Sequence, residues 1–156
     1  MNNMSMASSF VYGFGFEVSC SDELLVEFMK NHKKTFCASE NEILLFNEIV
    51  EHNSDEEDLE DYFKDYSCDC SEMEGLGAVI SNIMSRETDI RFEYQCGDAD
   101  CENSPTVLFS DSMPWTFNDI EKNLTEESLR EICNKFALEL GIDTNTIDMC
   151  AIEYFG

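Results

Sequence analysis

Basic residues are scarce in this sequence. Its 156 residues include nine lysines and arginines against 34 aspartates and glutamates, which gives a formal net charge of −25. Direct binding to nucleic acid needs cationic side chains that displace counterions from the phosphates, and anionic membranes attract the same kind of surface. We therefore expect no direct contact with nucleic acid or membrane. The charge favours a basic protein or a metal ion as partner.

Signatures of catalysis are also lacking. The two histidines, His32 and His52, have neither the H-x-E nor the H-E-x-x-H spacing of metal sites. No nucleophile elbow, phosphate-binding loop, dinucleotide fingerprint or calcium loop of the D-x-D-x-D-G type occurs. We expect His32, on an apolar helix face, to pack against the core. The sequence predicts a protein that is not an enzyme.

Long apolar runs are missing as well. No stretch of 18 apolar residues could span a membrane, and the first twenty residues lack the basic and apolar segments of a secretory signal. We therefore expect a cytoplasmic protein. Its eight cysteines are then expected to be reduced thiols, although their even number leaves a disulfide reading open.

Apolar residues are nevertheless plentiful, at 43% of the chain with twelve phenylalanines. At this length they support one hydrophobic core. We expect a flexible N-terminus over 1–9 and a single acidic domain over 10–156. Alternating apolar residues predict strands, and capping residues with apolar spacing predict helices. The strands are expected over 10–19, 90–96, 106–110 and 147–155, and the helices over 22–35, 39–51, 54–66, 76–86 and 126–140.

The order of these elements indicates an α+β fold. Helices and strands do not alternate regularly enough for a doubly wound parallel sheet. We expect a mainly antiparallel sheet of about four strands, with four to five helices packed on one face.

One segment concentrates the negative charge. Between Glu51 and Glu74 there are eleven acids and one base, Lys64. On the helix expected there, three carboxylates form a row at i, i+4 and i+8, namely Glu57, Asp61 and Asp65, and two more, Glu56 and Glu60, lie beside it. Like charges at this spacing cost helix stability. The row is either a solvated helix face or a surface held ready for a basic partner, to which Tyr62, Tyr66 and Trp115 could add aromatic contacts.

In size and charge the chain resembles two broad groups of proteins. The first is the phage-encoded inhibitors of bacterial defence nucleases, which include nucleic-acid mimics and anti-CRISPR proteins. The second is the immunity proteins that neutralise basic nuclease toxins. The resemblance is one of composition and carries no site residues. It implies a non-enzymatic inhibitor that binds the basic groove of a nuclease or another nucleic-acid-binding protein, with carboxylates in place of phosphates.

Two further readings remain open. Cys68-x-Cys70 and Cys96-x4-Cys101 could supply four thiolates to zinc, although their spacing is not that of paired C-x2-C knuckles. The chain would then be a zinc-stabilised adaptor domain. Without zinc, no cofactor is expected. In the other reading the first strand, with Gly13 and Gly15 on one face, belongs to a small hydrolase or a ligand-binding domain.

Overall fold

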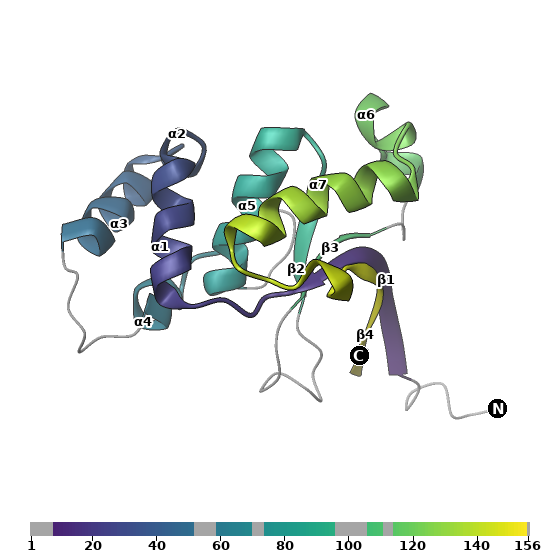
Figure 1. Ribbon diagram of the computed structural model, residues 1–156, viewed down its shortest axis with the longest axis horizontal. Coiled ribbons are helices and arrows are strands. Elements are labelled where there is room, and N and C mark those ends of the chain that lie inside the picture. The colour runs from purple at the N-terminus through teal and green to yellow at the C-terminus, as the bar shows by residue number, and fades with distance from the viewer. Residues whose placement is uncertain (1–7, 52–58, 70–73, 96–105, 111–113, 156) are drawn as a thin grey trace.

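The computed structural model describes residues 8–51, 59–69, 74–95, 106–110 and 114–155 (Figure 1). Within these ranges the α-helices are α1 (Asp22–Asn31), α2 (Lys33–Phe36), α3 (Glu40–Glu51), α4 (Leu59–Phe63), α5 (Leu76–Thr88), α6 (Asp119–Lys122) and α7 (Glu126–Glu139). The strands are β1 (Ser8–Glu17), β2 (Phe92–Gln95), β3 (Thr106–Ser110) and β4 (Asp148–Phe155). Two 3-10 turns, η2 (Pro114–Thr116) and η3 (Thr144–Thr146), complete the described elements.

Helix α5 lies at the centre of the fold. Every residue from Gly77 to Met84 is buried, and a helix buried all round must lie between layers. On one side α5 packs against β2 and β3, and on the other it packs against α2 and α4. Gly77 permits the closest of these contacts, because a Cβ at this position would lie 1.9 Å from the ring of Tyr94.

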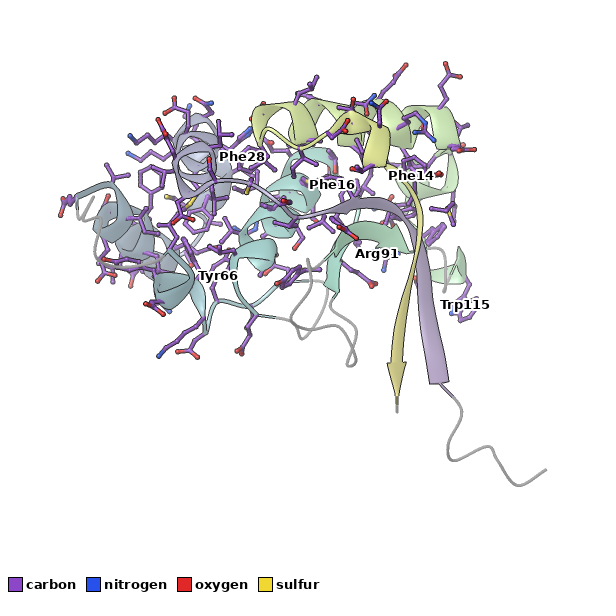
Figure 2. The ribbon with its side chains drawn as sticks, turned by 60° about the horizontal axis from the view of Figure 1, so that its bottom comes forward. Phe14, Phe16, Phe28, Tyr66, Arg91 and Trp115 are labelled. Carbon is purple, nitrogen blue, oxygen red and sulfur yellow. The ribbon has the colours of Figure 1, made fainter. Side chains whose placement is uncertain are left out.

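The strands form one antiparallel sheet in the order β2-β3-β1-β4. Two rows of paired residues cross all four strands, at Phe14 and Gly15 of β1. From Ser8 to Tyr12, β1 pairs with β4 alone. These two strands therefore leave the body of the protein as a two-stranded ribbon (Figures 1 and 2).

The expected architecture is wrong. We predicted a four-stranded sheet that carries four to five helices on one face, but the described residues are predominantly helical, and helical residues outnumber strand residues by more than two to one. Only α5 and α7 make extensive contacts with the sheet, whereas α1, α2, α3 and α4 pack mainly against each other and against α5. The reason is that α5 is buried on every side. The early helices pack against α5 and not against the sheet.

The individual elements lie close to their expected positions. β3 covers the expected residues 106–110, and α7 covers all but the last residue of its expected range. The helix expected over 22–35 is interrupted at His32 into α1 and α2. Among the described residues, no helix is long and apolar enough to cross a membrane.

Candidate partner-binding surface

Helices α3 and α4 lie at the same end of the molecule, away from the β1–β4 ribbon (Figure 1). Helix α3 and residues 59–69 together carry eight acids and one base, Lys64. We call their exposed carboxylates the acidic end. Its members are Glu40, Glu48, Glu51, Asp61, Asp65 and Asp69. Charges of one sign this close together produce a negative potential that attracts cations.

The rotation of α3 about its axis determines which of its side chains are exposed at the acidic end. The buried side of the helix carries Glu42, Phe46 and Ile49. Ile43 and Leu44 therefore point outward, 45% and 62% exposed. α3 therefore keeps an apolar buried face with Phe46 and Ile49, but it also buries a glutamate and exposes two aliphatic side chains, which departs from a simple amphipathic helix. The acidic end thus presents both carboxylates and apolar groups.

The buried Glu42 owes its position to partners from other elements. Its carboxylate accepts hydrogen bonds from Arg86 Nη1 at 2.8 Å, from the hydroxyl of Tyr66 at 2.5 Å and from the hydroxyl of Ser39 at 3.0 Å. Asn82 donates to the Tyr66 oxygen at 2.9 Å. Burial, together with the hydrogen bond to Glu42, raises the pKa of Tyr66 well above its usual value of 10. Tyr66 therefore stays protonated at neutral pH.

Above this network the surface is hollowed. The hollow has a volume of about 590 Å³ and lies between α3, α5 and the chain that follows α4. Asp65 and Asp69 line it together with Tyr62 and Tyr66. Arg86 contributes one positive charge to the lining, and its guanidinium also bonds Asp69, with Nη2 at 3.0 Å from Oδ2. A lysine or arginine of a partner could enter here, against carboxylates and aromatic rings.

All three arginines of the chain bond carboxylates within the fold. Arg86 pairs with Glu42 and Asp69, Arg91 pairs with Glu121, and Arg130 pairs with Glu126 and Asp148. The six lysines form no ion pair with a carboxylate of the described residues. Most of the exposed carboxylates among the described residues consequently form no ion pair with a basic side chain, whereas protein surfaces usually intersperse charges of both signs.

The acidic residues expected to bind a partner are only partly described. Asp61 and Asp65 are exposed. Glu60 lies in α4, whereas Glu56 and Glu57 lie outside the described residues. Because α4 ends at Phe63, Asp65 follows the helix instead of continuing a helical row.

The aromatic residues expected near this row separate into two places. Tyr62 and Tyr66 are half-buried and line the hollow. Trp115 is 77% exposed and lies at the other end of the molecule from Tyr66 (Figure 2). Trp115 therefore does not belong to the acidic end.

The expected zinc ligands are not brought together in what the structure describes. Cys68 is buried, with its sulfur 3.0 Å from the hydroxyl oxygen of Ser81. Cys70, Cys96 and Cys101 lie outside the described residues, among which no group of three or more potential metal ligands occurs. The zinc reading therefore stays an untested prediction.

Sequence reasoning missed the charged residues inside the fold, chiefly Glu42 and Arg86. The amide of Glu42 bonds the Ser39 hydroxyl at 3.3 Å, a local contact at the start of α3. Its pairing with Arg86, 44 positions later, left no local signal. The one hint in the sequence was that arginines are few and carboxylates many. Each arginine can therefore be expected to pair with a carboxylate of the fold.

Comparison with known proteins adds no relative. No family model, no curated protein sequence and no solved structure matches the chain.

Proposed function

We propose that this protein is a non-enzymatic acidic inhibitor. It acts in the cytoplasm and binds the basic groove of a nucleic-acid-binding protein, such as a nuclease, through its acidic end. The proposal rests on one observation. Every arginine bonds a carboxylate within the fold, and exposed carboxylates such as Asp61 and Asp65 form no ion pair among the described residues.

The proposed mechanism is competition with nucleic acid. A nuclease groove is lined with lysines and arginines that bind phosphates. Carboxylates spread over α3 and residues 59–69 would occupy the same cations and exclude the substrate. The net charge of −25 would accelerate the encounter at low ionic strength, and added salt would slow it.

The first test is affinity capture from a lysate of the source cells at low and at high salt, with mass spectrometry of the retained proteins. We expect a nuclease or another nucleic-acid-binding protein to be retained at low salt and displaced by added DNA or RNA. A captured defence nuclease would make the protein an anti-defence inhibitor of the phage or anti-CRISPR type. A captured toxin would make it an immunity protein.

A pair of variants then locates the surface. Asp61→Lys with Asp65→Lys reverses two charges at the acidic end, and Glu127→Lys with Glu131→Lys reverses two exposed charges on α7. Both doubles change the net charge equally. We expect the first to weaken capture strongly and the second to weaken it little. Equal effects, or capture that does not depend on salt, would refute the proposal.

A further inference from the structure

A second hollow lies at the other end of the molecule, between α7, the residues in and around α6, and the sheet near the root of the β1–β4 ribbon. Its volume is about 500 Å³. Six apolar side chains make up most of its wall: Phe14, Phe109, Phe117, Leu124, Leu129 and Met149. We call it the apolar pocket. Figure 2 shows Phe14 far from Tyr66, so this pocket is separate from the acidic end.

The sheet register and the helices fix the walls. Phe14 pairs with Phe109 of β3 on one side and with Met149 of β4 on the other. The rings of Phe109 and Phe117 lie 5.1 Å apart between centroids. The guanidinium carbon of Arg130 lies 5.0 Å from the centroid of Phe14 and holds that ring in place. The pocket is therefore built from well-packed side chains, with the 55% exposed Met149 at its mouth.

Polar groups in the wall are already occupied. The Glu121 side chain is fully buried and bonds the Arg91 guanidinium at 3.0 Å and the backbone amide of Asn118 at 2.9 Å. The Thr125 hydroxyl accepts the amide of Ser128, which caps α7. Lys122 is the one basic residue in the lining, and it is exposed. The interior thus offers apolar contact and few hydrogen bonds.

A surface hollow with mainly apolar walls leaves apolar area in contact with water, and covering that area is favourable. Pockets of about 300–1,000 Å³ with mainly apolar walls are typical of small-molecule sites. The surrounding charge of −25 would repel an anionic ligand. The two carboxylates that line the pocket, Glu121 and Glu126, already pair with Arg91 and Arg130, so neither lacks a counterion that a cationic ligand would supply.

We propose that the apolar pocket binds an uncharged small molecule with an aromatic or aliphatic body. Gly13, from the first strand whose glycines suggested a ligand site, also lines it. The inference does not depend on the proposed inhibitory function, because the two sites share no residue.

The test is titration of the full chain with N-phenyl-1-naphthylamine, an uncharged dye that fluoresces in apolar surroundings. We expect saturable binding of one dye per chain. Met149→Asp places a carboxylate at the mouth and should weaken the affinity by about tenfold or more, because the charge would be desolvated by the bound dye. Leu138→Asp, at a 69% exposed position on α7 outside the lining, is the matched control and should bind as the wild type does.

Thermal unfolding of each variant checks that it is folded. A second variant, Leu124→Phe, adds volume inside the pocket and should also weaken the dye without adding charge. Non-saturable binding, equal loss in the Met149 and Leu138 variants, or full affinity in both pocket variants would overturn the inference.

Discussion

At the scale of single residues, one buried carboxylate and its arginine connect three helices. Glu42 is 5% exposed, and Arg86 connects it to Asp69 and to the backbone carbonyls of Thr35 and Phe36. Removing one member of a buried ion pair leaves the other charge without compensation. The network therefore holds α2, α3 and α5 together more firmly than an exposed ion pair would.

Arg86→Met should lower the free energy of unfolding by about 3 kcal/mol, because it leaves the Glu42 carboxylate buried without a cation. Glu126→Gln is the control, since it removes an exposed pair with Arg130, and it should cost about 1 kcal/mol or less. Urea unfolding measures both. Equal losses would mean that the Glu42 pair contributes no more than a surface contact.

His32 connects three helices. It ends α1, and its two ring nitrogens lie 2.8 Å from Glu87 of α5 and 2.6 Å from Glu139 of α7. Burial lowers the pKa of His32, but the hydrogen bonds to Glu87 and Glu139 outweigh burial, so the pKa is raised above its usual value of 6.5. The doubly protonated ring can donate to both carboxylates, whereas the neutral ring can donate to one.

The stabilisation from His32 should depend on pH. A raised folded-state pKa means that the contribution is complete below the unfolded value of about 6.5 and is lost as pH rises through the folded value. His32→Gln should therefore cost more stability at about pH 6 than at pH 8. The measurement is urea unfolding of both proteins across this range. A difference that does not change, or that grows with pH, would contradict the assigned contacts.

At the scale of elements, the packing of α5 depends on a glycine. Gly77→Ala would improve helix propensity by about 1 kcal/mol, but the added Cβ would meet the buried ring of Tyr94 at 1.9 Å. We expect the clash to prevail and to lower stability by about 1–3 kcal/mol. Chemical unfolding would show it. In a Tyr94→Leu background the same substitution should cost less, and an unchanged cost would place the strain elsewhere.

Local patterns predicted the elements better than their arrangement. Alternation over 90–96 located β2, and the Thr125 cap located the start of α7. The central position of α5 was hidden, because Ser81 and Asn82 look like solvent-facing residues but are buried. Ser81 bonds the carbonyl of Gly77, and Asn82 bonds Tyr66 and the carbonyl of Ser67. These partners come from tertiary contacts or from within the helix, so spacing alone could not indicate them.

The candidate site, like the fold, could be predicted from the sequence only in part. Exposure of Asp61 and Asp65 followed from composition and agrees with the structure. The hollow beside these residues could not be predicted from composition, because it forms only where α3, α5 and the residues after α4 meet. The outward direction of Ile43 was also beyond local reasoning, since the partner of Glu42 fixes the rotation of α3.

At the scale of the whole molecule, the proposed binding surface differs from the other helices in how its charges are compensated. Acidic residues occur on every described α-helix except α2, including the exposed Glu127 and Glu131 of α7. α7 nevertheless places Lys135 four residues after Glu131, a spacing that favours compensation. Residues 59–69 have four acids against Lys64 alone. A basic partner should therefore prefer the acidic end over α7.

The most direct test of this claim is an NMR titration of the labelled protein with an oligolysine peptide, at low ionic strength and again in about 1 M NaCl, where the Debye length falls to about 3 Å. We predict amide shift changes concentrated in α3 and residues 59–69, with smaller changes in α7, and their loss in high salt. Shifts spread evenly over α3 and α7, or shifts that persist in high salt, would contradict a dedicated acidic binding surface.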